Sequence, residues 1–139
     1  PVRRLESDLP GITVTGTVDD VKPYLQRASV FVAPIRLGEG IKGKILEALA
    51  MGLPVVATTR SLRGLQLTPG REVLAADTAD EFAAQCLRLL GSAELRGELG
   101  RQGLELVRGR YEWSRLAPQV GDLYDEVLGR RAPEEAHAL

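Results

Sequence analysis

A glycine-rich loop with two lysines is the first segment of the chain that could do chemistry. Residues 38–43 are Gly-Glu-Gly-Ile-Lys-Gly, and Lys44 follows directly. Such a loop, opening into a helix, exposes backbone N–H groups at the positive end of the helix dipole and offers a site for phosphate. Lys42 and Lys44 would add positive charge there. The alternative is a solvated turn that carries two surface lysines.

The loop nearly matches two phosphate-binding motifs. Residues 38–43 fit the G-x-G-x-x-G pattern of dinucleotide-binding folds, and Arg60 follows the next expected strand, where NADP would need a basic residue. However, residues 34–37 separate the expected strand from the first glycine, and Glu39 would place a carboxylate beside the pyrophosphate. The P-loop spacing is also present, but Ile45 replaces the hydroxyl residue that holds magnesium. Neither motif is complete.

Two glutamates, Glu39 and Glu47, lie on either side of this candidate anion site. Because Glu47 lies between the apolar residues Leu46 and Ala48, we expect a half-buried carboxylate that needs hydrogen-bond partners. Two acceptor groups around an anion site suit a ligand with a phosphate centre and polyol ends, as in a sugar nucleotide. The alternative is two surface glutamates at a chance spacing.

Four short stretches rich in Val and Ile predict the strands that must position these residues. They are residues 12–16, 29–35, 54–58 and 72–76. Helical patterns lie between and after them, which favours a parallel sheet with helices on both faces.

Local capping signals predict where the helices begin. Asp19 and Asp20 can cap a helix that ends near residue 28, and the helix that carries Glu47 begins near residue 43. Thr78 and Glu81 form a capping box, and Phe82, Cys86, Leu89 and Leu90 follow at helical spacing, so we expect Cys86 in the core. Two later helices are expected to be capped by Ser92 and Ser114. The apolar side of the last one comprises Leu116, Val120, Leu123, Tyr124, Val127 and Leu128.

Size and composition exclude several classes of protein. With 139 residues and a formal charge of -1, the chain has the length of one domain and no overall field that would hold nucleic acid, so no nucleic-acid partner is expected. One cysteine and one histidine, His137, exclude internal disulfides and structural zinc. No apolar run is long enough to span a membrane and no signal peptide is visible, so we expect a cytoplasmic protein.

Residues 39–41 and 45–58 together resemble the E-x7-E signature region of retaining GT-B glycosyltransferases of family 4, the group 1 type. The similarity extends to Val-Thr-Gly-Thr-Val at residues 14–18 and Phe-Val-Ala-Pro at residues 31–34, and covers about residues 12–128. It implies an α/β fold with a Rossmann-like parallel sheet and helices on both faces. The chain would be the C-terminal half of a GT-B enzyme, and this half would be truncated at its N-terminus. Residues 1–128 would form a donor-binding domain that lacks its first strands, and residues 129–139 a flexible tail.

The resemblance also implies the site residues. Glu39 would contact hydroxyls of the transferred sugar, and Glu47 would accept hydrogen bonds from the ribose hydroxyls. Lys44, with Glu39, is assigned to catalysis because its charge would offset that of the diphosphate. The further expected donor-binding residues are Gly38, Gly40, Ile41, Lys42 and Val18. The implied reaction transfers a hexose from a UDP- or GDP-type sugar to an acceptor hydroxyl with retention, without a metal or other cofactor.

The implied partners lie outside this chain. A missing N-terminal half would bind the acceptor, a glycan or a lipid-linked sugar. The run Gly-Ile-Lys-Gly-Lys resembles bacterial enzymes that build exopolysaccharide or envelope glycans, either free in the cytoplasm or peripheral at the inner face of the membrane. We expect the isolated chain to be inactive. We also expect it to dimerise or swap a strand, because missing strands leave a sheet edge open.

Two other function classes stay open at this point. An NADP-dependent oxidoreductase would use the glycine pattern and Arg60, whereas a non-catalytic interaction module would use the loop only as a connection. A response regulator, suggested by Asp19 and Asp20, is excluded because no aspartate follows residues 31–35 to accept a phosphoryl group. Arg63 and Gly64 are further possible phosphate or sugar contacts, with an ordinary surface loop as the alternative.

Overall fold

A small parallel sheet lies at the centre of the molecule in this computed structural model, which describes residues 3–38, 40 and 42–129. Within that part of the chain the strands are β1 (Phe31–Ala33), β2 (Val55–Ala57) and β3 (Leu74–Ala75), in the order β1-β2-β3. Phe31 pairs with Val55, and Val56 pairs with Leu74. Because both pairings are parallel, the three carboxyl ends lie at one edge of the sheet.

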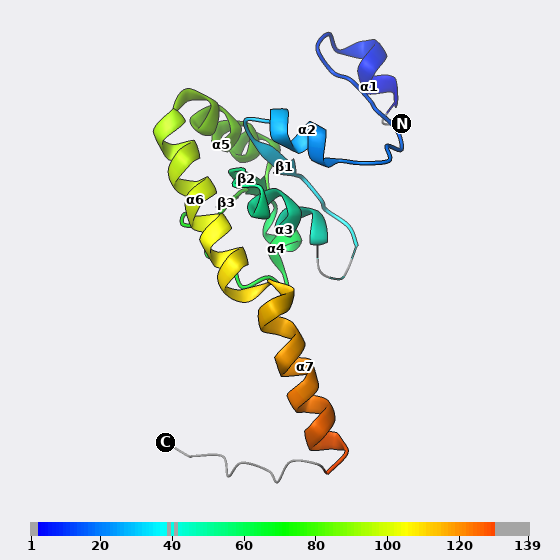
Figure 1. The fold of residues 1–139 in the computed structure, drawn as a ribbon. Coiled ribbons are helices and arrows are strands. Elements are labelled where there is room, and N and C mark those ends of the chain that lie inside the picture. The colour runs from blue at the N-terminus through cyan, green and yellow to red at the C-terminus, as the bar shows by residue number, and fades with distance from the viewer. Residues whose placement is uncertain (1–2, 39, 41, 130–139) are drawn as a thin grey trace.

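Helices precede, separate and follow these strands. They are α1 (Arg3–Asp8), α2 (Lys22–Arg27), α3 (Gly43–Ala50), α4 (Thr59–Leu62), α5 (Ala79–Gly91), α6 (Ala93–Arg110) and α7 (Trp113–Val127). Figure 1 shows α3, α5 and α6 gathered around the sheet, with α1 apart from this body at one end and α7 extending away from it at the other.

The core has two layers, one on each face of β2. Val55, Val56 and Ala57 are all fully buried. Because successive strand side chains point to opposite faces, Val55 and Ala57 join one apolar cluster and Val56 joins the other. The helical residues packed around β2 include Ile45, Ala48 and Leu49 of α3 in the first cluster, and Leu89 of α5 and Leu99 of α6 in the second. The expected parallel sheet with helices on both faces is confirmed.

Helix α6 approaches α3 closely through two glycines. A Cβ on Gly100 would overlap the backbone carbonyl of Gly52, just after α3, and a Cβ on Gly103 would come within 2.5 Å of the Leu49 side chain. Only glycine permits this approach without displacing α6. Helix α3, which carries Glu47, is therefore held between the sheet and α6.

The expected strand at residues 12–16 is not formed. These residues are irregular, and the Val14 amide donates to a carboxylate oxygen of Glu6 in α1 at 3.2 Å. A β-prone stretch becomes a strand only when another strand pairs with it, whereas this segment follows α1 away from the sheet (Figure 1). The other three predicted strands are present but shorter than expected, because only their central residues pair with a neighbouring strand.

Most of the predicted helix starts are correct. The Thr78–Glu81 capping box is present, and the Ser92 hydroxyl accepts from the Leu95 amide at 3.1 Å. The cap predicted at Asp19 or Asp20 is wrong, because Val21 is the N-cap of α2, although Asp20 accepts from the amide of Lys22, the first residue of α2, at 2.9 Å. The cap predicted at Ser114 is wrong, because α7 already begins at residue 113, after Glu112.

Two further expectations concern the C-terminal part. Cys86 is half-buried against the second cluster, as predicted, and burial raises the pKa of its thiol. The apolar side of α7 is largely exposed, including Leu123, Tyr124 and Val127. The tail expected at residues 129–139 lies, after Gly129, outside the described residues.

Candidate functional site

The glycine loop leaves the carboxyl end of β1 and leads into α3. Gly38 and Gly40 have φ angles of +102° and +90°, a region that favours glycine because other residues are strained there. Ligands of open parallel sheets bind at the carboxyl ends of the strands, which is where this loop begins. Glu39 and Ile41 lie outside the described residues, so their roles stay predictions.

Three of the predicted side chains lie together near this loop. The Lys42 ammonium lies 3.6 Å from the position that a Cβ on Gly38 would occupy. Lys44 Nζ lies 3.2 Å from Glu47 Oε2, with side chains 68% and 48% exposed. Among the described residues, two lysines and one of the two expected glutamates therefore lie in this loop and at the start of α3. Val18, in contrast, lies in the irregular segment before α2.

The expected half-burial of Glu47 is wrong. Its neighbours in sequence suggested an apolar environment, but the buried stripe of α3 consists of Ile45, Ala48 and Leu49. At 3.6 residues per turn, Glu47 lies on the opposite side of the helix from that stripe. Its carboxylate is open to solvent and forms an ion pair with Lys44.

Two buried hydroxyl groups tie the end of β1 to the end of β2. The Thr58 hydroxyl donates to the carbonyl oxygen of Ile35 at 2.7 Å, and it lies 2.7 Å from the Ser61 hydroxyl. Thr58 also caps the short helix α4 by accepting from the Ser61 amide at 3.2 Å. Neither Thr58 nor Ser61 was among the predicted site residues. Thr58 could have been recognised as a helix cap, because it directly follows a strand and precedes a Ser by three residues.

A third connection joins the ends of β2 and β3. The Thr59 amide donates to Asp77 Oδ1 at 2.8 Å. Hydrogen bonds from the Thr59 hydroxyl, and then from its amide, lower the pKa of Asp77. The loops that follow all three strands are thus tied together at the edge of the sheet where the glycine loop begins.

A cavity of about 290 Å³ opens at this same edge. Its charged lining groups come from Arg36, which precedes Gly38 in the loop, and from Asp77. Pro34 and Phe82 contribute apolar surface. Arg36 was not among the predicted site residues, because an isolated arginine between two apolar residues matches no motif.

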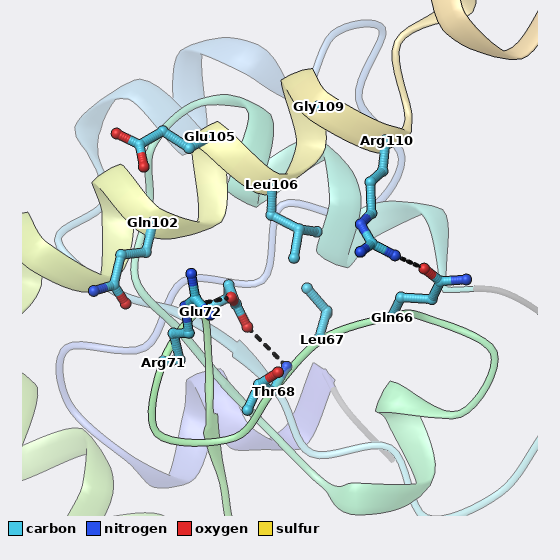
Figure 2. A pocket seen from close by; sticks show the side chains of 10 residues that line it. All are labelled: Gln66, Leu67, Thr68, Arg71, Glu72, Gln102, Glu105, Leu106, Gly109 and Arg110. Carbon is cyan, nitrogen blue, oxygen red and sulfur yellow. Dashed lines mark hydrogen bonds and ion pairs between the residues drawn. The ribbon is translucent and has the colours of Figure 1, made fainter.

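A larger cavity, about 660 Å³, lies elsewhere, between α6 and the loop of residues 66–72 (Figure 2). Leu67 and Leu106 face each other across it, and the buried carboxylate of Glu72 accepts from the Thr68 amide at 2.8 Å. This loop precedes β3, so the cavity lies toward the amino ends of the strands. Its size therefore does not make it part of the glycine-loop site.

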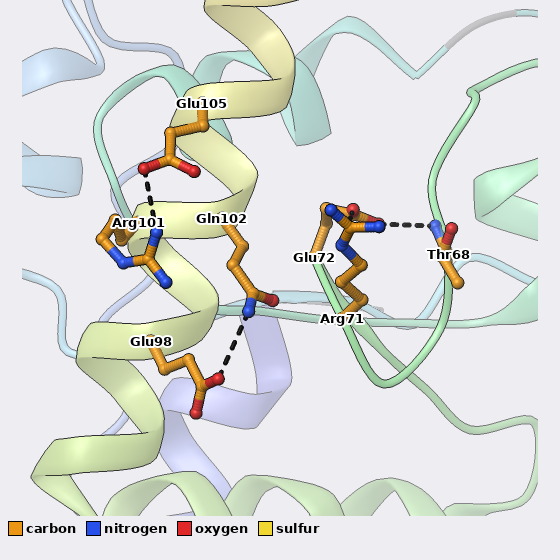
Figure 3. A network of polar contacts seen from close by, with 7 residues as sticks. All are labelled: Thr68, Arg71, Glu72, Glu98, Arg101, Gln102 and Glu105. Carbon is orange, nitrogen blue, oxygen red and sulfur yellow. Dashed lines mark hydrogen bonds and ion pairs between the residues drawn. The ribbon is translucent and has the colours of Figure 1, made fainter.

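Polar contacts on the α6 surface and in the loop of residues 66–72 lie at and beside this cavity (Figure 3). Arg71 Nε lies 3.2 Å from Glu72 Oε1, and Arg101 pairs with Glu105 one turn later on α6 at 2.9 Å. Neighbours at this helical spacing on an exposed surface contribute little energy. These charged side chains near the cavity are thus already paired with one another, on α6 and within the loop of residues 66–72.

Two kinds of feature, a metal-binding cluster and a membrane-spanning helix, are absent from the described residues. No group of three or more His, Cys, Asp or Glu side chains there could hold a metal ion. Among the helices that the structure describes, none is both long and apolar enough to cross a membrane.

The sequence is similar to known glycosyltransferases. The family described as glycosyl transferases group 1 matches residues 1–92. The chain is 34% identical over 119 residues to trehalose synthase from Rubrobacter xylanophilus, a match that covers 85% of this chain and 28% of that protein. It is 31% identical over 133 residues to phosphatidyl-myo-inositol mannosyltransferase from Mycolicibacterium smegmatis, covering 92% and 34% respectively.

The fold is similar to that of a solved enzyme. Sucrose-phosphate synthase from Thermosynechococcus elongatus matches with a TM-score of 0.81 and 27% identity, over 93% of this chain and 35% of that one. The chain thus spans between 28% and 35% of the length of these relatives. The family match includes the glycine loop, α3 and β1–β3, the part of the fold in which the predicted motif lies. The α/β arrangement is that of a GT-B enzyme, and the chain belongs to the group 1 glycosyl transferases.

Proposed function

We propose that this chain binds the nucleoside-diphosphate-sugar donor of a retaining hexosyltransferase. The observation that best supports this is the place of the glycine loop between β1 and α3, at the carboxyl edge of the sheet, with positive φ angles at Gly38 and Gly40. Backbone N–H groups in such a loop, at a helix N-terminus, attract a diphosphate. The mannosyltransferase among the relatives favours a hexose as the transferred sugar, and the proposed donor carries it on UDP or GDP.

Lys44 and Glu47 have separate roles in this proposal. Glu47 accepts hydrogen bonds from the ribose hydroxyls, and Lys44 approaches the diphosphate. Their mutual ion pair does not oppose these roles, because a pair this exposed contributes less than about 1 kcal/mol. Lys42, beside Gly38, adds a second cation. Glu39 and the amides of Gly40 and Ile41 complete the sugar side of the site, and Val18 lies near the base.

The proposed reaction is displacement of the nucleoside diphosphate from the anomeric carbon by an acceptor hydroxyl. The departing diphosphate takes the electron pair of the broken C–O bond and the proton of the acceptor hydroxyl, and the lysines and loop amides offset the charge that develops on it. The donor-side chemistry uses no metal and no other cofactor. Glu39, with Lys44, is the proposed catalytic pair.

The acceptor belongs to a part of the enzyme beyond this chain. We propose a longer enzyme whose N-terminal half binds a glycan or a lipid-linked sugar, because this chain spans 34% of a relative named for phosphatidyl-myo-inositol. Such an enzyme would work in the cytoplasm, or peripherally at the inner face of the membrane, in the synthesis of exopolysaccharide or envelope glycans. The chain alone would bind donor without transferring sugar.

Calorimetric titration with UDP and GDP in EDTA tests the site. Lys44→Ala should weaken diphosphate binding more than nucleoside binding, whereas Glu47→Ala should weaken both the nucleoside and the diphosphate. Arg101→Ala and Glu105→Ala are matched controls, since they break an exposed ion pair on α6. Equal affinities in all four variants would remove Lys44 and Glu47 from the site, and stronger binding of NADPH than of either diphosphate would favour an oxidoreductase.

A further inference from the structure

A buried pair of hydroxyls lies beneath the start of the glycine loop. Thr58 is 5% exposed, and Ser61 is fully buried. The Thr58 hydroxyl donates to the carbonyl oxygen of Ile35 at 2.7 Å. Ile35 is followed by Arg36 and Leu37, and then by Gly38. The hydroxyl pair therefore holds the chain just before the loop changes direction at its first glycine.

The direction of the hydrogen bonds follows from the number of hydrogens. Each hydroxyl has one hydrogen to donate. Because Thr58 donates to Ile35, Ser61 is the donor in the 2.7 Å contact between the two hydroxyls. Ser61 Oγ also donates to the carbonyl oxygen of Ala33 at 3.1 Å, and that oxygen accepts from the Thr58 amide as well, at 3.3 Å, because a carbonyl oxygen has two lone pairs. The Ser61 hydrogen is thus shared between Thr58 and Ala33, and the two hydroxyls connect the end of β1 to residues 58–61.

The loop is held at its other end by α3. The Ile45 amide donates to the Lys42 carbonyl at 2.9 Å, and the Ile45 side chain is fully buried. At the β1 end of the loop, Pro34 has a fixed φ angle and no N–H that could bond to the sheet. The hydrogen bond from the Thr58 hydroxyl to the Ile35 carbonyl restrains the residues that follow Pro34. A loop fixed at both ends loses less conformational entropy when it closes on a ligand.

We infer that Thr58 and Ser61 are positioning residues for the donor loop: they hold its start so that the backbone amides of Gly38, Gly40 and Lys42 face the donor diphosphate. Neither residue has to touch the donor. The inference rests on the proposed function, but the bonds that restrain the loop exist without nucleotide. The restraint and the donor binding can therefore be measured separately.

The first measurement is amide hydrogen exchange of residues 36–44 in the 139-residue chain without nucleotide. Thr58→Val removes the hydroxyl with little change of shape, and Thr58→Ser retains it. Ser92→Ala is the matched control, because it removes another helix-capping hydroxyl, on α6, that does not contact the loop. Ser61→Ala removes the donor to Thr58 and serves as a second test if Thr58→Val does not fold.

Thr58→Val should accelerate exchange in the loop about three- to tenfold, the effect of one net hydrogen bond, while Val56 in β2 stays protected. Thr58→Ser should restore the slower exchange. In the second measurement, Thr58→Val should weaken UDP or GDP binding by a similar factor, and Thr58→Ser should restore it.

Each part of the inference can fail separately. Loop exchange in Thr58→Val that equals that in Ser92→Ala would show that the hydroxyls do not restrain the loop. Faster loop exchange with unchanged nucleotide affinity would show that the restraint does not serve binding. Absence of nucleotide binding by the unmodified chain would contradict the proposed function itself, and the exchange result would still decide whether Thr58 holds the loop.

Discussion

Lys44 and Glu47, beside the glycine loop, can turn toward a ligand because both side chains are exposed. Lys44 and Glu47 face solvent on the outer side of α3, and their ion pair is of the kind that contributes less than about 1 kcal/mol. Groups buried in stronger pairs would have to lose those pairs first. Their exposure is therefore compatible with recognition of a diphosphate and a ribose.

The positions of Lys44 and Glu47 could be predicted because a motif is a local pattern. The bond between Thr58 and Ile35 could not, because it joins residues that are 23 positions apart. Such a bond depends on how β1 and β2 pair, which no local pattern contains. The exposure of Glu47 was mispredicted for a related reason, since neighbours in sequence lie on different sides of a helix.

The pKa of Asp77 should be measurably low. The hydrogen bonds from Thr59 lower it below the ordinary value of 3.8. Because the pKa is depressed in the folded state, ionised Asp77 contributes stability above pH 3.8, and this contribution is lost as the pH falls through the folded-state pKa. A carboxyl-carbon NMR titration should place the midpoint below 3.8, and Thr59→Val should move it upward. A midpoint at or above 3.8 would show that Thr59 does not hold the carboxylate in solution.

At the element scale, capping residues and apolar periodicity predicted the helices better than apolar runs predicted the strands. Thr78 and Ser92 cap the helices that they were expected to cap, because a cap involves residues within one turn. Residues 12–16 have the composition of a strand but no strand beside them. Helix α4 was missed because its four residues are little more than one helical turn, too few for an apolar periodicity to show.

The close approach of α6 gives a prediction at this scale. Gly100→Ala should lower the free energy of unfolding by about 1–3 kcal/mol, because the added methyl group would overlap the carbonyl of Gly52 and push α6 outward. Gly97→Ala, on the same helix with open space around it, should be neutral or stabilising by up to about 1 kcal/mol. Chemical denaturation measures both. Equal effects of the two substitutions would mean that α6 does not pack against the turn after α3 as described.

At the scale of the whole molecule, surfaces that are usually covered in a compact domain lie open. Strand β1 is at the edge of the described sheet, and Val32 at its centre is 47% exposed. The apolar side of α7 is also exposed. Open strand edges pair readily with other strands. Composition and spacing contain no information on which strand lies at a sheet edge. The open sheet edge was therefore expected from the family resemblance alone.

We therefore predict that the isolated chain associates through the β1 edge. Sedimentation should show species larger than the 15.1 kDa monomer at micromolar concentrations. Val32→Lys should shift the distribution toward monomer, because a charged edge strand resists pairing. Val120→Lys, a matched change on the exposed side of α7, should have little effect. A reversed result would assign the association to α7, and a monomer at every concentration would contradict edge pairing.

The most direct test of donor binding is a map of amide chemical shifts during titration with UDP, GDP, ADP and NADPH in EDTA. Saturable binding of one nucleoside diphosphate should shift the amides from Gly38 to Glu47 and leave those near the larger cavity, such as Thr68 and Arg110, unchanged. That result would also identify the base. Shifts confined to the larger cavity, or saturable binding of NADPH alone, would contradict a donor site at the glycine loop.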